Sequence, residues 1–223
     1  MQGVDIYGFL QQLPIIAIPM LFAITLHEVA HGWVAKNLGD PTAYMLGRLT
    51  LNPIKHIDPL GTVIVPLALL LFSGGTMAFG WAKPVPVAFR NLRNPRRDMI
   101  LVAAAGPASN LLMATGWALI IAGLVSFLSF GSVVDQWLYQ MSLFGILINV
   151  VLAVFNLLPV PPLDGGRVLA GLLPPAGARV IDNIEPYGLL IVVALMVTGI
   201  LWTILLPFIQ VFQSFFLALA GVR

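Results

Sequence analysis

The sequence predicts an all-α polytopic membrane protein. We expect about five to six transmembrane segments, a re-entrant or interfacial segment, and short extended or β elements. Three observations lead to this fold class: 59% of the 223 residues are hydrophobic and only 9% are charged, the apolar residues form long runs, and the basic residues cluster. Soluble domains carry roughly 25% charged residues, and an apolar run of about 20 residues can cross a bilayer as a helix. We expect residues 1–223 to form one integral-membrane domain.

The first apolar run, residues 13–38, predicts a membrane helix that ends at a Gly-Asp-Pro turn. Its second half contains His27, Glu28 and His31, although the whole chain has only three histidines and two glutamates. Residues four apart share one face of a helix, so both imidazoles can reach one metal ion. The glutamate between them can then act on a water at the metal, which is how an H-E-x-x-H motif works. The pattern therefore indicates a zinc protease site.

The segment after the first helix is polar and rich in turns as far as Pro59. Residues 60–72 are apolar but rise only about 20 Å as a helix, so we expect them to re-enter or lie at the interface rather than span. Residues 79–87 contain Pro84 and Pro86 and cannot form a helix interior. They predict extended chain, either an edge strand or a hairpin. Arg93, Arg96 and Arg97 then predict an anchor at anionic lipid.

Residues 99–127 and 137–158 predict two further membrane helices. The first contains Asn110 and the second Asn149, which we expect to pack between helices. The apolar residues 187–220 are interrupted at Pro207 and are compatible with one kinked helix or with two shorter ones.

The charge distribution predicts the orientation of the chain in the membrane. Of the eleven Lys and Arg residues, eight lie between Lys36 and Arg97. Because basic loops tend to be cytoplasmic, the loop after the first helix is predicted to face the cytoplasm. The next two helices then bring Asp164 back to the same side as His31.

A catalytic zinc usually has three protein ligands and one open position. Since the chain has no cysteine, its ligands must be imidazoles and carboxylates. Asp164 is the best third candidate, because it ends an apolar helix on the correct side within an irregular Pro/Gly segment. His56 is the alternative, but its turn-rich loop favours a structural or surface role.

Two motifs resemble those of the site-2 proteases, a family of intramembrane zinc metalloproteases. The family pairs H-E-x-x-H with N-x-x-P-x-P-x-L-D-G, and the chain matches both at every specified position, in residues 27–31 and 156–165. The resemblance implies that one Zn²⁺ ion is bound by His27, His31 and Asp164, that Glu28 is the catalytic acid/base, and that Asn156 supports the substrate or metal. The chain resembles a minimal core of the family, without PDZ or CBS domains.

The resemblance further implies hydrolysis within or near transmembrane segments of membrane-protein substrates, in regulated intramembrane proteolysis. Such substrates include transmembrane proteins and signal-peptide remnants, and the other partner is the lipid bilayer; no nucleic-acid partner is indicated. We expect a multi-pass protein of a bacterial or archaeal cell membrane, with its active site towards the cytoplasm. The main alternative is a metal transporter or metal-binding membrane protein, for which further ligands along a path would be expected. An inactive scaffold is a third possibility, which the intact motif pair disfavours.

Overall fold

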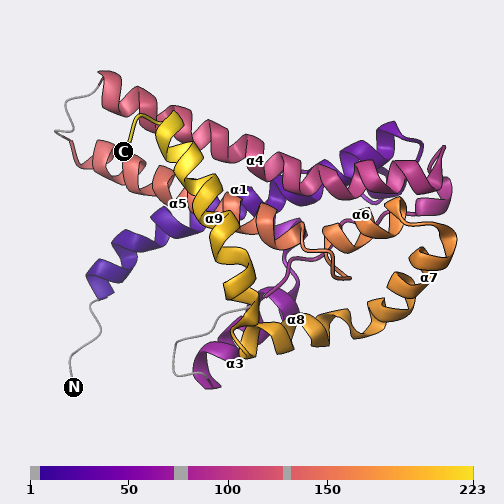
Figure 1. The fold of residues 1–223 in the computed structure, drawn as a ribbon. Coiled ribbons are helices and arrows are strands. Elements are labelled where there is room, and N and C mark those ends of the chain that lie inside the picture. The colour runs from indigo at the N-terminus through magenta and orange to yellow at the C-terminus, as the bar shows by residue number, and fades with distance from the viewer. Residues whose placement is uncertain (1–5, 73–79, 128–131, 223) are drawn as a thin grey trace.

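The computed structural model describes residues 6–72, 80–127 and 132–222 and consists of helices joined by short irregular segments (Figure 1). The long helices are α1 (Ile6–Asn37), α4 (Pro95–Phe127), α5 (Val133–Asn156) and α9 (Ile200–Leu219), and the shorter ones are α2 (Thr42–Met45), α3 (Val65–Phe72), α6 (Asp164–Leu172), α7 (Pro175–Ile184) and α8 (Gly188–Val197). Four short turns of other helix types connect them: η1 (Pro53–His56), η2 (Pro59–Ile64), η3 (Phe89–Asn91) and η4 (Glu185–Tyr187).

Five helical stretches of the described chain are long and apolar enough to cross a membrane, which confirms the predicted fold class. They are residues 11–37, 95–126, 133–156, 175–197 and 200–219. The α2 helix and the η1, η2 and α3 segments lie between the first two stretches. Pro59–Phe72 forms a π-helical turn followed by α3. The whole segment is too short to span the bilayer, in agreement with the prediction that it does not cross.

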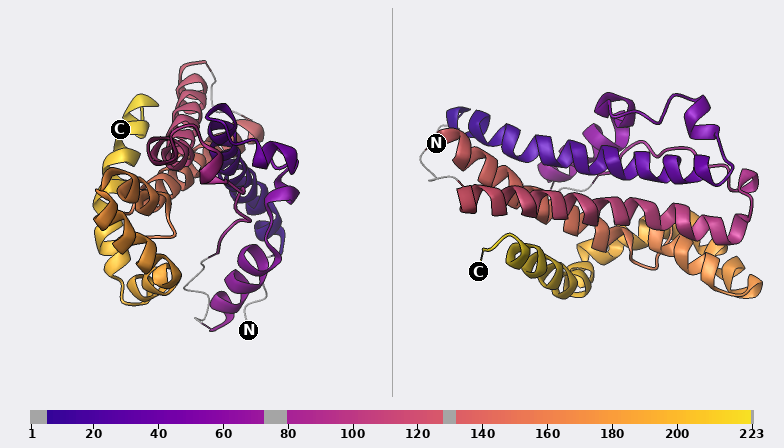
Figure 2. Two further views of the ribbon diagram at one scale, coloured as in Figure 1. Left: turned by 90° about the vertical axis from the view of Figure 1, so that its right-hand side faces the viewer. Right: turned by 90° about the horizontal axis from the view of Figure 1, so that it is seen from above.

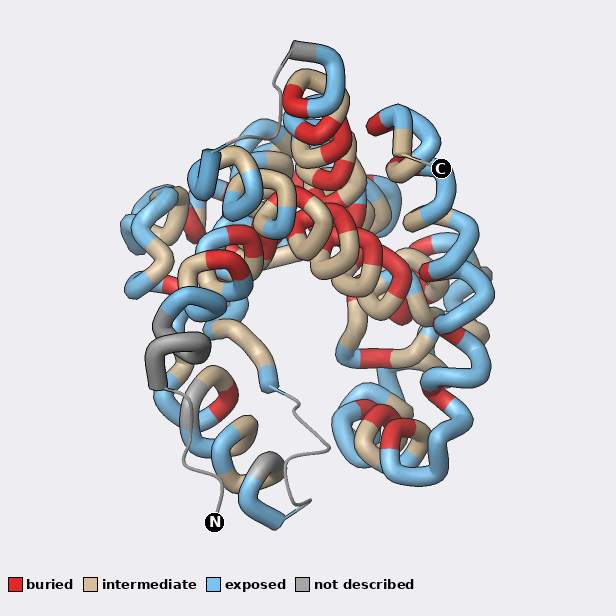
Figure 3. The backbone as a smooth tube through the Cα atoms, turned by 90° about the vertical axis from the view of Figure 1, so that its left-hand side faces the viewer, coloured by how far each residue is buried: buried red, intermediate tan, exposed pale blue. Residues whose placement is uncertain are grey.

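Helices α1, α4 and α5 run side by side, and α9 crosses α5 (Figures 1 and 2). Buried residues concentrate where these helices meet (Figure 3). The largest apolar cluster joins α4, α5 and α9 and includes Ile121, Ile146 and Leu205. Small residues bring the helices close together: a Cβ on Gly145 of α5 would overlap the Trp117 ring of α4. Such close approach is what packs helices in lipid, where the hydrophobic effect between helices is absent.

The C-terminal apolar region is divided at Gly199. This glycine has φ = 76° and separates α8 from α9, whereas Pro207 lies inside α9. A left-handed residue ends a helix, while a membrane helix tolerates proline where neighbouring groups compensate the lost hydrogen bond. The sequence predicted an interruption at Pro207, whereas the structure has two helices that are separated at Gly199.

Residues 80–88, here called the strap, run without regular secondary structure along α1. The predicted extended region began at residue 79, which lies outside the described residues. No β-strand occurs in residues 6–72, 80–127 and 132–222, so the β alternative is not realised. Pro84 and Pro86 donate no backbone hydrogen bond. Four other strap amides bind separate partners instead of one ladder: Trp81 N–H to Gly61 O (3.0 Å), Lys83 N–H to His56 O (2.9 Å), Val85 N–H to Glu28 Oε2 (2.7 Å) and Ala88 N–H to Asp40 Oδ2 (2.7 Å).

Candidate metal centre and active site

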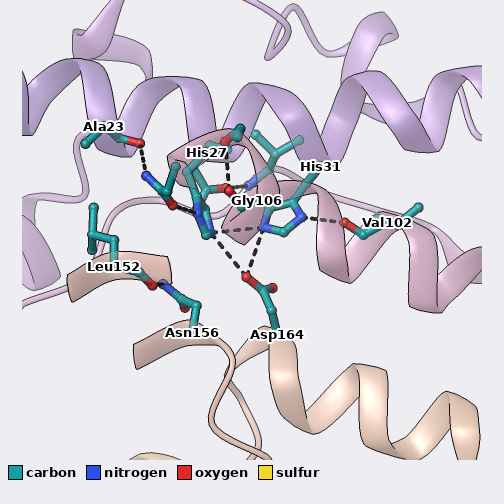
Figure 4. Close-up of polar contacts among 12 residues, drawn as sticks. Ala23, His27, His31, Val102, Gly106, Leu152, Asn156 and Asp164 are labelled. Atoms are coloured by element: carbon teal, nitrogen blue, oxygen red, sulfur yellow. Dashed lines mark hydrogen bonds and ion pairs between the residues drawn. The ribbon is translucent and has the colours of Figure 1, made fainter. Parts of the chain in front are cut away.

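Three buried side chains converge between α1 and the first residue of α6 (Figure 4). His27 Nε2 lies 3.1 Å from His31 Nε2, and Asp164 Oδ2 lies 3.2 Å from the first nitrogen and 3.3 Å from the second. All three residues are at most 9% exposed. The structure therefore brings together the three predicted ligands, which the sequence separates by more than half of the chain.

The orientation of the His31 imidazole follows from its partner on α4. His31 Nδ1 lies 2.7 Å from the Val102 carbonyl oxygen. Because a carbonyl can only accept, Nδ1 of this ring carries the proton. In the neutral ring Nε2 is then unprotonated, and its lone pair points to Asp164. His27 has the same arrangement, with Nδ1 at 2.6 Å from the side-chain oxygen of Asn110.

These orientations fit a bound cation. Two imidazole lone pairs and a carboxylate oxygen face one another, and Asp164 Oδ2 is buried without a hydrogen-bond partner. Such a group of acceptors repels itself unless a positive ion lies between them. Tetrahedral ligands of zinc at 2.0–2.1 Å are separated by about 3.3 Å, close to the three distances observed here. The donor set and its spacing both match a zinc site that keeps a fourth position open.

Helix α4 approaches the imidazoles at Gly106. A Cβ at this position would lie 2.5 Å from His27 Cε1 and 2.6 Å from His27 Nε2, and it would also overlap His31 Nε2. Only a residue without a side chain leaves this space free. Gly106 therefore lets α4 pack against the ligand face of α1 without displacing either ring.

Asp164 is held by a tight loop and by the helix that it starts. A Cβ on Gly165 would overlap the backbone of Leu157 and Leu158, so glycine is required where the end of α5 meets the start of α6. At the other end of α6, Arg96 of α4 donates to the carbonyls of Gly171 and Leu173. The sequence predicted this arginine as a lipid anchor, but it also caps the helix that begins at Asp164.

Glu28 lies on α1 directly after His27, on the side covered by the strap. Its Oε2 accepts the Val85 N–H at 2.7 Å. Asn156, the other residue of the predicted site, ends α5, and its Nδ2 donates to Leu152 O of its own helix at 2.9 Å (Figure 4). His56 is buried and separate: its Nε2 lies 3.0 Å from the Thr50 carbonyl oxygen.

Asn110 and Asn149 are the polar residues whose relation to the site was missed from the sequence. Both are fully buried, and they connect α1, α4 and α5. A signal was present, because an amide within a membrane helix is costly and often has a functional reason.

Comparisons with known proteins identify the family of the chain. The model of "Peptidase family M50" matches residues 116–199, which include Asn156 and Asp164. The chain is 39% identical over 209 residues to a protein named "Putative zinc metalloprotease YwhC" of Bacillus subtilis, with 90% of each chain covered. The chain belongs to peptidase family M50.

A second relative of this M50 peptidase is a protein named "Putative zinc metalloprotease Rip2" of Mycolicibacterium smegmatis, with 32% identity over 80% of the chain and 64% of the relative. The Rip2 of Mycobacterium tuberculosis strain H37Rv is 30% identical over 78% of the chain and 63% of that protein. No solved structure matches the chain significantly.

Proposed function

We propose that this M50 peptidase is an intramembrane zinc endopeptidase that cleaves membrane-protein substrates within or near their transmembrane segments. The observation that carries the proposal is the convergence of His27, His31 and Asp164, with Glu28 beside them on α1. Family membership and the names of the relatives agree with a metallopeptidase that uses zinc. We further propose that residues 1–223 act as a single domain, and that its active site faces the cytoplasm because the basic residues cluster near this end of α1.

The depth of the site supports cleavage inside the membrane. The candidate span ends at Asn37, and His27 lies ten residues earlier, or about 15 Å along the helix axis. That depth is well within a hydrocarbon core of about 30 Å. A peptide bond cut at this position must belong to a segment that enters the bilayer and unwinds, because a helix hides its carbonyls in internal hydrogen bonds.

We assign the metal-binding role to His27, His31 and Asp164. Zinc held there would polarise the scissile carbonyl and acidify a water molecule. Glu28 is the general base and acid: it accepts a proton from the attacking water and delivers it to the leaving amine. The Val85 N–H holds one carboxylate oxygen of Glu28 and so fixes the direction of the other. Asn156 is proposed as a supporting residue, since it ends α5 just before the loop that leads to Asp164.

The strap is the proposed guide for the unwound substrate. An extended segment can bind an unwound peptide by pairing with it as an added strand, a common mode of peptide recognition. Its contact with Glu28 supports a location near the scissile bond. In this structure the Val85 amide is engaged by the catalytic residue, so substrate pairing would have to use other backbone groups of the strap.

The substitution Glu28→Gln tests the function. The variant should retain zinc at the wild-type ratio and lose cleavage of a model transmembrane peptide in detergent or liposomes, because the amide cannot accept the proton of the water. Cleavage at the wild-type rate would overturn the proposal. A metal transporter is less favoured, because the described residues contain no second group of three potential ligands and the chain belongs to a peptidase family.

A further inference from the structure

The two histidines of the metal group are oriented in different ways. His31 is fixed by a backbone carbonyl, that of Val102. His27 is fixed by a side chain, that of Asn110, at 2.6 Å. Asn110 has 0% exposure, so it is enclosed by the helices around it.

Every hydrogen-bonding group of the Asn110 amide has a partner. Its nitrogen donates to Ala23 O at 3.2 Å and to Asn149 Oδ1 at 2.9 Å, while its oxygen faces His27. Ala23 lies one helical turn before His27, so Asn110 binds both the ring and the helix backbone that carries the ring. An amide is suited to this place, since it offers two donors and an acceptor without adding a charge.

Ala23 and Asn149 both determine which way the Asn110 amide points, because the Ala23 carbonyl can only accept from the Asn110 nitrogen. Asn149 Nδ2 donates to Gly145 O at 2.8 Å, and a backbone carbonyl can only accept. The Asn149 oxygen therefore faces Asn110, the Asn110 nitrogen faces Asn149, and the Asn110 oxygen is left to accept from His27 Nδ1–H. Two backbone carbonyls, Ala23 O on α1 and Gly145 O on α5, thus orient the Asn110 amide, and the amide in turn sets the tautomer of His27.

We propose that Asn110 and Asn149 are positioning residues for the metal centre, which hold His27 in the tautomer whose Nε2 lone pair faces the metal. The inference rests on the metal group proposed above. Partners that orient a ligating histidine commonly change metal affinity about 10- to 100-fold when they are removed. Simple helix packing by the two amides predicts instead a loss of stability with no change in zinc affinity.

The experiment measures zinc affinity of the full-length chain in detergent, in a Glu28→Gln background that prevents self-cleavage. The metal-free protein is titrated with zinc against a chromophoric chelator. Asn110→Leu should weaken zinc binding by about 10- to 100-fold. Asn149→Leu should weaken it less, because Asn110 keeps its bond to the Ala23 carbonyl, which still orients the amide. Cobalt(II) in place of zinc should show an altered visible spectrum in both variants.

The matched control is Ser142→Ala. Ser142 lies on α5, is 0% exposed, and donates only within its own helix, to Leu138 O at 2.7 Å. This variant should bind zinc like the parent. If Asn110→Leu does not fold, Asn149→Leu decides the question, since Asn149 contacts no ligand. Parent-like zinc affinity and cobalt spectra in the asparagine variants would overturn the inference, whereas a parent that binds no zinc would overturn the proposed function as well.

Discussion

A substitution at Gly106 tests the metal centre without replacing any of the proposed ligand residues. In Gly106→Ala the new methyl group would lie 2.5 Å from His27 Cε1 and 2.6 Å from His27 Nε2, where ordinary contact begins at 3.4 Å. Relief of the overlap requires a shift of roughly 0.8 Å or more, several times the tolerance of about 0.2 Å in metal–ligand distances. The rings can yield only by leaving Asn110 and Val102. We expect zinc affinity to fall about 10- to 100-fold, as when the partners that orient a ligating histidine are lost.

Gly116→Ala is the matched control, because it lies on the same helix and a Cβ there meets nothing within 4 Å. Both substitutions favour the helical state by up to about 1 kcal/mol. The assay is the zinc content of purified protein after dialysis against a weak chelator, together with peptide cleavage and the melting temperature of the metal-free protein. If Gly106→Ala retained zinc as well as Gly116→Ala does, the geometry of this site would be refuted.

Two further changes test the contacts of the strap with Glu28 on α1 and with Asp40, which follows α1. Val85→Pro removes the backbone N–H that donates a hydrogen bond to Glu28. A hydrogen bond to a charged group contributes about 1.5–3 kcal/mol, so the cleavage rate should fall roughly 10- to 100-fold while the zinc content stays unchanged. Val85→Ala keeps the amide and is the control, and equal activity of the two variants would contradict the role of this contact. At Asp40, burial raises the carboxyl pKa, but hydrogen bonds from Thr42, Asn91 and the Ala88 amide outweigh it and lower the pKa below its ordinary 3.8. The resulting stabilisation is complete above pH 3.8 and is lost as the pH falls through the lowered pKa. The metal-free wild type should therefore have a higher melting temperature than Asp40→Asn at neutral pH, and this difference should shrink below pH 3.8. A difference that does not change with pH would contradict the role of the Asp40 carboxylate.

The sequence predicted the parts of the site that depend on spacing along one helix. His27 and His31 share a face of α1 because four residues make about one turn. Asp164 could be placed on the same side of the membrane because charge and the number of helices constrain it. Its contact with both nitrogens required the structure, since the turn after α5 depends on close backbone packing at Gly165.

Other features depend on how helices are rotated against one another, which local sequence does not encode. Asn110 and Asn149 were expected to pack helices, and only the structure shows that Asn110 reaches His27 and that Asn149 reaches Asn110. Arg96 lies in a basic segment that predicts a lipid anchor. Its hydrogen-bond partner, the Gly171 carbonyl, lies 75 residues later in the sequence, and only the fold brings the two together. The strap could be predicted as extended, but whether it forms a ladder depends on which acceptors lie opposite its amides.

The metal group also has a mechanical consequence. Helix α6 packs mainly on α4 and α7, so a metal ion bound by His27, His31 and Asp164 would be the direct fastening between α6 and α1. That fastening would close a loop of about 130 residues, and a cross-link over such a loop removes much of the freedom of the unfolded chain. Zinc would thus hold two helices together as well as supply chemistry, and its loss would leave α6 without this link to α1 while the α4–α5–α9 core stayed packed.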